Sequence, residues 1–231
     1  MGERWWTWRR RLLNRAIQGS WRWVQSRGAI FPGTRAAERF GSFGPGSLLG
    51  FPVATLYGEP SIHIGSGTLI ASWVTLAAGY GPGQADVPER ALVIGDRCLV
   101  NVRCGLVAHE SIEIGDDVWF GQGVYITDAN HGFDDLDVPI GRQLGEHRPV
   151  TVGRGSWLGN GAVILPGARI GRQCVVAAGS VVRGEVPDFS VVAGVPARVI
   201  RRLDDGSRAH TEGRLEDWVE PLAAGFGTWE A

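Results

Sequence analysis

Large aliphatic residues recur at a strict interval of six along residues 152–182. This interval fits neither an α-helix, which repeats about every 3.6 residues, nor a β-strand, which alternates about every second residue. It predicts a chain that turns a corner after each short flat segment and points one large side chain inward from each segment. The repeating residues are Val152, Leu158, Ile164, Ile170, Val176 and Val182.

Three flat segments would complete one triangular coil of about eighteen residues, so residues that far apart should stack on one another. Each buried aliphatic side chain contributes roughly 1.5–3 kcal/mol, so several coils are needed for stability. Small residues after the aliphatics, such as Gly153 and Ala177, allow tight corners. The sequence therefore predicts an all-β solenoid, a parallel β-helix. Its expected stacked pairs are Val152 with Ile170, Leu158 with Val176, and Ile164 with Val182.

The same spacing outlines a coil domain over residues 62–202. Residues 79–91 break the register and should form a loop. Residues 129–149 are a polar excursion too long for a corner, so they should project as a loop, and long loops on rigid scaffolds often carry function. Prolines and glycines predict an irregular connection over residues 41–61, and residues 203–231 form a polar tail with a weak helical pattern.

The N-terminal segment, residues 1–40, is rich in tryptophan and carries nine arginines against Glu3 and Glu38. We expect a helix over residues 1–27. Two interpretations of this helix remain open. It contacts a membrane peripherally, with indole rings at headgroup depth and guanidinium groups on anionic lipid. Alternatively, its tryptophan side packs on the solenoid or on a partner subunit.

Three cysteines, Cys98, Cys104 and Cys174, lack metal-ligand spacing, and each lies two residues before an inward aliphatic. We expect buried, unreactive thiols. No apolar run reaches the roughly 18 residues of a membrane span, and no secretory signal is visible, which favours a cytoplasmic location. No phosphate-binding glycine motif of a nucleotide-hydrolysing enzyme occurs, and the tryptophans of the basic segment favour lipid or protein over nucleic acid as its partner.

His131 is the strongest candidate catalytic residue, because it stands where the regular coil gives way to the long loop. A neutral imidazole is a suitable general base near pH 7. His109 is its rival, although it could simply cap a corner. The five histidines, at positions 63, 109, 131, 147 and 210, show no paired spacing, so we expect no metal site of the three-histidine zinc type that γ-type carbonic anhydrases use on such a solenoid.

The repeats combine with three further stretches: ITDANH at 126–131, WLGNGAVILPG at 157–167 and AGVPAR at 193–198. Together they resemble the hexapeptide-repeat acyltransferases, and within these the galactoside and maltose O-acetyltransferases, with the xenobiotic acetyltransferases nearby. The resemblance covers residues 62–202. It implies a left-handed β-helix, a homotrimer with active sites between subunits, and acetyl-CoA or another acyl-CoA as co-substrate.

The resemblance also implies roles for individual residues. His131 matches the general base that deprotonates the acceptor hydroxyl, and Asn101 matches an asparagine that contacts the acceptor. His109, with Glu110 adjacent, stands where the sugar enzymes place an acceptor-binding acid, and Asp128 could orient the imidazole of His131 or hold acceptor hydroxyls. Trp157, Asn160, Gly161 and Ala178 match the groove for the pantetheine arm, while Arg198 and Arg201 match basic residues near the nucleotide phosphates. The chain departs from the family at Arg183-Gly184, where related enzymes often have Thr-Lys, but Arg183 can supply the positive charge one position earlier.

Each of these assignments has a plainer alternative. Asn101 could close a corner, the glycine and alanine could be ordinary coil residues, and the arginines could be solvated. The expected function is an acyl-CoA-dependent O-acyltransferase, in particular an O-acetyltransferase, that acts on a sugar-like hydroxyl of a small or lipid-linked acceptor. N-acetylation of an amino sugar and a catalytically silent scaffold are the alternatives.

Overall fold

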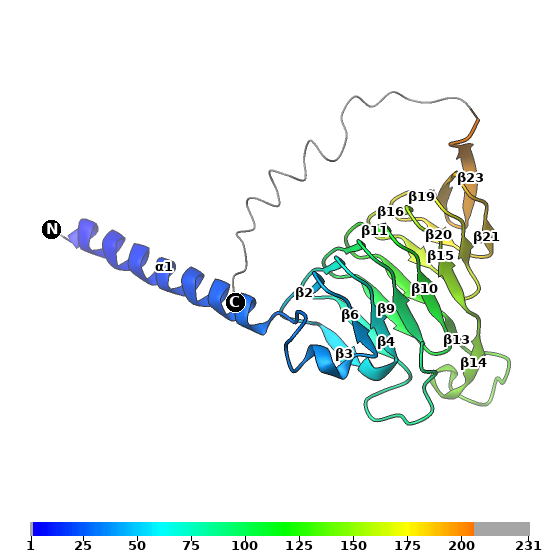
Figure 1. Ribbon diagram of the computed structural model, residues 1–231, viewed down its shortest axis with the longest axis horizontal. Coiled ribbons are helices and arrows are strands. Elements are labelled where there is room, and N and C mark those ends of the chain that lie inside the picture. The colour runs from blue at the N-terminus through cyan, green and yellow to red at the C-terminus, as the bar shows by residue number, and fades with distance from the viewer. Residues whose placement is uncertain (1, 206–231) are drawn as a thin grey trace.

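The computed structural model describes residues 2–205, with side chains from Trp8 onward. A parallel β-helix of triangular cross-section fills most of this range, and each coil adds one strand to each of three sheets (Figure 1). The first sheet contains β1 (Ser42–Phe43), β4 (Ile62–Ile64), β7 (Leu92–Ile94), β10 (Ile112–Ile114), β15 (Val150–Val152), β18 (Arg169–Ile170) and β21 (Glu185–Val186).

The other two sheets follow the same order along the axis. The second sheet contains β2 (Leu48–Leu49), β5 (Leu69–Ile70), β8 (Leu99–Val100), β11 (Trp119–Phe120), β16 (Trp157–Leu158), β19 (Val175–Val176), β22 (Ser190–Gly194) and β23 (Ala197–Arg202). The third sheet contains β3 (Thr55–Tyr57), β6 (Thr75–Ala78), β9 (Gly105–Ala108), β12 (Tyr125–Thr127), β17 (Val163–Ile164) and β20 (Val181–Val182).

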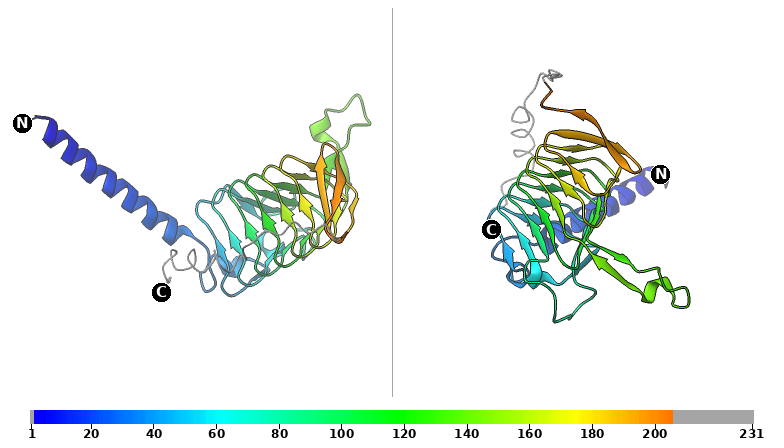
Figure 2. Two further views of the ribbon diagram at one scale, coloured as in Figure 1. Left: turned by 90° about the horizontal axis from the view of Figure 1, so that it is seen from above. Right: turned by 90° about the vertical axis from the view of Figure 1, so that its right-hand side faces the viewer.

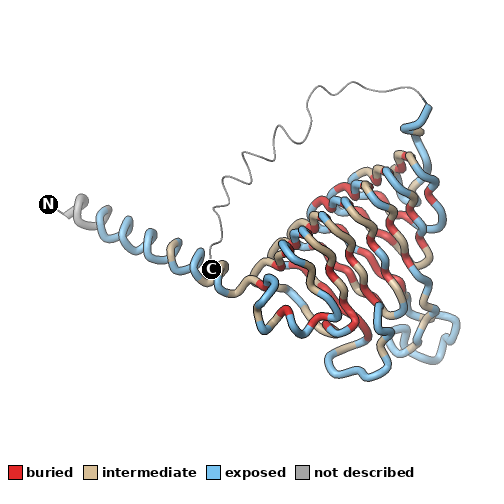
Figure 3. The backbone as a smooth tube through the Cα atoms, viewed as in Figure 1, coloured by how far each residue is buried: buried red, intermediate tan, exposed pale blue. Residues whose placement is uncertain are grey.

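The stacking expected from the six-residue interval is confirmed. Val152 pairs with Ile170, Leu158 with Val176 and Ile164 with Val182, all in parallel register. The large aliphatics of successive coils fill the interior of the prism, where the buried residues form one continuous column (Figure 3). The three cysteines are free and buried in that column, as expected. Burial raises the pKa of the Cys98 thiol to about 11, which leaves it protonated at neutral pH.

The solenoid starts earlier than the sequence suggested. Residues 41–61 are not an irregular connection, because β1, β2 and β3 pair in parallel with β4, β5 and β6 and make a complete first coil. The inward positions of this coil are Phe43, Leu49 and Leu56. Their spacing is six and then seven residues, because an extra residue sits in the corner that contains Pro52. A strict interval of six therefore fails to detect the coil.

The C-terminal end of the solenoid is closed by an antiparallel pair, β22 with β23, at the edge of the second sheet. The second strand of this hairpin ends at Arg202. The weak helical pattern of the polar tail lies outside the described residues.

The expected N-terminal helix is present as α1 (Gly2–Gly28), and residues 29–41 contain only the short helix η1 (Ala37–Arg39). Helix α1 projects from the first coil and points away from the β-helix (Figure 1). Packing of its apolar side on its own solenoid is therefore contradicted. Its large apolar side chains are exposed: Trp8, Leu12, Leu13, Ile17, Trp21 and Trp23. No helix within residues 2–205 is long and apolar enough to cross a membrane.

Corners connect the sheets along three edges of the prism, each made of one short segment per coil. The first edge joins the first and second sheets, and includes residues 65–68, 95–98, 115–118, 153–156 and 171–174. The second edge joins the second and third sheets, with residues 71–74, 101–104, 121–124, 159–162 and 177–180. The third edge returns to the first sheet, with residues 79–91, 109–111, 128–149, 165–168 and 183–184.

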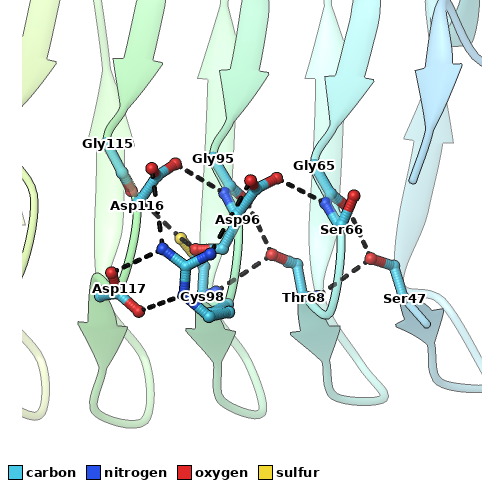
Figure 4. A network of polar contacts seen from close by, with 11 residues as sticks. Ser47, Gly65, Ser66, Thr68, Gly95, Asp96, Cys98, Gly115, Asp116 and Asp117 are labelled. Atoms are coloured by element: carbon cyan, nitrogen blue, oxygen red, sulfur yellow. Dashed lines mark hydrogen bonds and ion pairs between the residues drawn. The ribbon is translucent and has the colours of Figure 1, made fainter. Parts of the chain in front are cut away.

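Polar side chains tie the coils together along the first edge (Figure 4). The Asp96 carboxylate accepts a hydrogen bond of 2.7 Å from the amide of Ser66, one coil away, and Asp116 accepts one of 2.9 Å from the amide of Asp96. The Thr68 hydroxyl donates to the carbonyl of Gly95 and accepts from the amide of Cys98. Backbone amides in the corners that do not pair with a neighbouring strand thus donate to side chains of an adjacent coil.

Candidate active site

The excursion over residues 129–149 is a hairpin arm, which adds secondary structure to the projecting loop that we expected. Its strands are β13 (Ala129–His131) and β14 (Leu144–His147), which pair antiparallel, and η3 (Ile140–Arg142) lies between them. The arm leaves the third edge and extends outward from the prism (Figure 2). It places a strand end, rather than a mobile coil, at the position of the predicted catalytic histidine.

His131 ends β13, and its side chain is exposed. Its Nδ1 lies 3.4 Å from the carbonyl oxygen of Gln143 on the opposite side of the arm. The Gln143 side chain in turn donates to the carbonyls of Asp135 and Val138, both at 2.7 Å, and accepts from the Asp135 amide at 3.2 Å. These bonds hold the tip of the arm in a defined shape, so the imidazole of His131 is presented to solvent on an ordered support.

Asp128 lies at the base of the arm and is fully buried. Its carboxylate accepts from the backbone amides of His109, Glu110 and Ser111, at 2.8 Å from the nearer oxygen in each case. The oxygen Oδ1 also lies 3.3 Å from Nδ1 of His109. Burial opposes ionisation of Asp128, but the hydrogen bonds from His109 and the three amides outweigh it and hold its pKa below the usual value.

Asp128 was expected to hold acceptor hydroxyls, but its carboxylate is fully buried within this chain. It was also expected to orient the imidazole of His131, but the imidazole next to it is that of His109, and Nδ1 of His131 faces the Gln143 carbonyl instead. The carboxylate thus fixes the corner that carries His109 and leaves Nε2 of this histidine to face other partners. Glu110, the next residue, is exposed.

An aromatic cluster that the sequence did not predict surrounds His109. The ring of Tyr80 lies 4.5 Å from that of His109, and the ring of His147 lies 5.4 Å from it, centroid to centroid. The Tyr80 hydroxyl hydrogen-bonds Nε2 of His147. The cluster fastens the arm to the coil, because Tyr80 and His109 belong to the third edge while His147 belongs to β14. The only sequence signal was that Tyr80 and His109 both lie in third-edge corners of successive coils, directly after paired strands.

The remaining predicted residues lie elsewhere. Asn101, Asn160, Gly161 and Ala178 share the second edge, and Trp157 is exposed on the adjoining β16. The side-chain oxygen of Asn101 accepts from the amide of Val102 at 2.8 Å, and that of Asn160 accepts from the amide of Gln122 at 2.9 Å. Both asparagines therefore close corners, and each keeps its amide nitrogen available for a ligand.

The three predicted arginines are exposed near the C-terminal end of the solenoid. Arg183 lies on the third edge after β20, while Arg198 and Arg201 lie on β23. Within one chain, the structure thus separates the histidine set on the third edge from the asparagine set on the second. The third sheet lies between them, and its longest strands, which have four residues, span about 13 Å. No cluster of His, Cys, Asp or Glu suited to a metal ion occurs in the described part of the chain.

Two family models match the solenoid. The hexapeptide model described as bacterial transferase hexapeptide (six repeats) matches residues 149–184, and the hexapeptide repeat of succinyl-transferase matches residues 91–128. A galactoside O-acetyltransferase of Lactococcus lactis is 33% identical over 140 residues, which cover 60% of this chain and 67% of that protein. The chain belongs to the hexapeptide-repeat acyltransferase family, and its parallel sheets fit the left-handed β-helix of that family.

A putative lipopolysaccharide biosynthesis O-acetyl transferase, WbbJ of Escherichia coli, is 36% identical over 49% of this chain and 61% of its own length. The fold resembles that of AntD, an N-acyltransferase from Bacillus cereus in complex with dTDP and 3-hydroxybutyryl-CoA, with a TM-score of 0.61 at 20% identity over 82% of this chain and 94% of that one. The chain spans only 43% to 61% of the length of the first curated relatives it matches.

Proposed function

We propose that the protein is an acyl-CoA-dependent O-acyltransferase, in particular an O-acetyltransferase, acting on a hydroxyl of a sugar-like acceptor, with His131 as the general base. The observation that carries the proposal is the exposed imidazole at the end of β13, held on an ordered arm beside a regular solenoid. N-acylation of an amino sugar is the near alternative, because the same base could take a proton from an amine.

Direct transfer requires one general base and one nucleophilic attack on the thioester carbonyl. The acceptor hydroxyl gives its proton to His131 as its oxygen attacks the thioester carbonyl, and the resulting oxyanion collapses with loss of the CoA thiolate. The imidazolium then returns the proton to the thiolate, so the histidine is regenerated. Because Nδ1 faces the Gln143 carbonyl, we assign the resting proton to Nδ1 and the base role to Nε2.

The second edge is the proposed donor groove. Gly161 has a φ of 66°, and a side chain at this position would meet no atom within 4 Å. The groove is thus open, which suits a pantetheine arm lying along the coils beside Trp157, Asn160 and Ala178. Arg198 and Arg201 on β23, with Arg183 nearby, would meet the phosphates of the nucleotide, for which the planar guanidinium is well matched.

The separation of the two residue sets supports a homotrimer. An arm on the third edge can complete a groove on the second edge only if the groove belongs to a neighbouring subunit. The outer faces of the second and third sheets expose large apolar side chains, including Trp119, Trp157 and Tyr125, whereas the first sheet exposes charged ones such as Glu113 and Arg169. Two apolar faces on one prism suit the cyclic packing of one sheet on the next subunit's other sheet.

The acceptor would then bind between His131 and Asn101, with His109 and Glu110 as further contacts from the third edge. In this arrangement Asp128 acts as a positioning residue for His109. The sugar-like nature of the acceptor rests on the resemblance to sugar O-acetyltransferases, and the polar lining fits a molecule with several hydroxyls.

Helix α1 is a proposed membrane contact for an otherwise cytoplasmic enzyme. Its exposed Leu13, Ile17 and Trp21 share the helix with exposed Arg11 and Arg15, a combination suited to anionic lipid surfaces. The full chain should bind anionic vesicles, and replacement of these two arginines and the exposed Arg22 by Gln should weaken that binding. Equal binding by the variant would contradict the proposal and leave a partner subunit as the alternative.

The catalytic proposal is tested with His131→Ala. Turnover of acyl-CoA with a panel of sugar acceptors should fall by about 10²–10⁴-fold, the usual contribution of a general base, while acyl-CoA affinity changes little. Leu144→Ala is the matched control, because Leu144 is exposed and pairs with His131 across the arm. Unchanged turnover in His131→Ala would refute the assignment, and failure of the parent chain to bind any acyl-CoA would favour a silent scaffold.

A further inference from the structure

One position of the second edge adopts the left-handed backbone conformation in successive coils. In the coils toward the C-terminus it is occupied by Gly123, Gly161 and Gly179, with φ from 66° to 68°. In the two preceding coils it is occupied by Trp73 and Arg103, each with φ 61°. The open part of this edge therefore ends, on its N-terminal side, at two large side chains.

These two side chains line a pocket of about 360 Å³ together with Ala54. The strands that follow them pair in parallel, Thr75 with Gly105, so Trp73 and Arg103 lie about 4.8 Å apart along the axis. Trp73 is 53% exposed and Arg103 is also exposed. The pocket thus offers one indole ring and one guanidinium group side by side.

Arg103 differs from Arg97, which occupies a left-handed position on the first edge of the same coil. Arg97 donates two hydrogen bonds to Asp117, at 2.7 and 2.8 Å, which raises its pKa. Arg103 makes no hydrogen bond or ion pair within the described residues. The second-edge segments from residue 71 to residue 180 contain no Asp or Glu, so nothing on this edge neutralises the charge of Arg103.

We propose that this pocket binds the phosphate of a phosphorylated sugar acceptor, with Arg103 on the phosphate oxygens and the indole of Trp73 against a ring of the ligand. A guanidinium fork suits phosphate geometry, and an indole face can pack against the apolar C–H face of a sugar ring. The inference rests on the proposed function and adds a substrate class to it.

The location of the pocket agrees with this role. Arg103 lies two residues after Asn101, the proposed acceptor contact, so a sugar at Asn101 could extend its phosphate toward Arg103. The proposed donor groove begins at the glycines on the opposite side of Arg103. The coils on the N-terminal side lead to α1, so a phosphate that continues into a lipid would point toward the proposed membrane contact (Figure 1).

Calorimetric titrations of the full chain test the proposal. The soluble probes are glucose-1-phosphate and UDP-glucose, with glucose as the uncharged comparison. Vesicles of phosphatidylcholine with and without phosphatidylinositol represent a sugar phosphate on a lipid. Arg103→Gln and Trp73→Leu are the test variants, and Arg97→Gln is the matched control from the first edge.

A phosphorylated probe should bind, glucose should not, and Arg103→Gln should lose about tenfold or more in affinity, as expected for a charge-assisted contact. Trp73→Leu should also weaken binding, Arg97→Gln should not, and acetyl-CoA affinity should be the same in all three variants. Because α1 is itself expected to bind anionic vesicles, the source of the phosphate is identified by the probe, soluble or vesicle, whose affinity falls in Arg103→Gln.

Three results would overturn the inference: no binding of either kind of phosphorylated probe, equal losses in Arg103→Gln and Arg97→Gln, or a loss of acetyl-CoA affinity in Arg103→Gln. These outcomes are separate from those of the catalytic proposal. If His131→Ala abolishes turnover while Arg103→Gln binds the probes normally, only the inference fails. If the probes need Arg103 but no acyl-CoA binds, only the catalytic proposal fails.

Discussion

The first and second edges of the prism share a corner geometry but differ in the side chains that they carry. On the first edge, Asp96, Asp116 and Asp188 each accept a hydrogen bond from a backbone amide of the preceding coil. On the second edge, two side chains of the described residues accept such a bond from another coil, Asn160 from the amide of Gln122 and Ser180 from the amide of Gly194. Carboxylates therefore join coils along the first edge, whereas neutral side chains join them along the second edge, which we propose as the ligand groove.

Charge distribution follows the same division. The first edge alternates acids and arginines, such as Asp117 with Arg97 and Asp188 with Arg172, so its charges are largely compensated. The second edge carries Arg103 and no acid in its segments from residue 71 to residue 180. We therefore propose that the composition of an edge, rather than the repeat itself, decides whether its corners join coils or bind a ligand.

The largest expected effect on stability comes from the hydrophobic core, which lies behind both edges. Phe120 is almost fully buried on β11, the strand that connects a first-edge corner to a second-edge corner. Phe120→Ala should lower the free energy of unfolding by about 3–5 kcal/mol, because it removes a large core side chain and leaves a cavity. Denaturant unfolding measures this value. A loss below about 1 kcal/mol would show that the column is loosely packed and that edge contacts carry more of the stability.

A smaller effect is expected at the third edge. Asp128→Asn should destabilise the protein by about 1–3 kcal/mol at pH 7, because a buried acceptor of three amides is weakened. The folded-state pKa of Asp128 is lowered, so its stabilisation is present above the unfolded value of about 3.9 and is lost as the pH falls through the folded value. The difference between parent and variant should therefore shrink in acid. A difference that is constant with pH would contradict this account of Asp128.

The smallest effect contrasts the two edges directly. Asp96→Ala should cost about 0.5–1.5 kcal/mol, since it removes a hydrogen bond between coils. Gln122→Ala, the second-edge counterpart, should change stability by less than about 0.5 kcal/mol, because Gln122 is bonded through its backbone amide and carbonyl and its side chain makes no hydrogen bond in the described residues. Thermal unfolding of both variants checks the contrast, and equal losses would remove it.

The sequence predicted the solenoid well because each flat face contributes one inward aliphatic, and this rule leaves a direct mark on spacing. The first coil was missed where one extra residue separates Leu49 from Leu56. The contact between Tyr80 and His147 could not be predicted, because it joins a corner loop to a strand of the arm that lies 67 residues further along the chain. Asp128 was assigned to the acceptor because a sequence does not show that a carboxylate is enclosed by backbone amides.

The division between edges is tested most directly by one calorimetric titration with acetyl-CoA. Gly161 on the second edge and Gly155 on the first both have left-handed φ, 66° and 70°, so Leu at either carries a similar backbone strain of roughly 1–2 kcal/mol. A side chain at Gly155 must also displace the end of the flexible Gln173 side chain, so the control variant is the more perturbed of the two. The account predicts that Gly155→Leu binds acetyl-CoA like the parent chain while Gly161→Leu loses about tenfold or more. Normal binding by Gly161→Leu, or an equal loss in both variants, would contradict the assignment of the second edge as the donor groove.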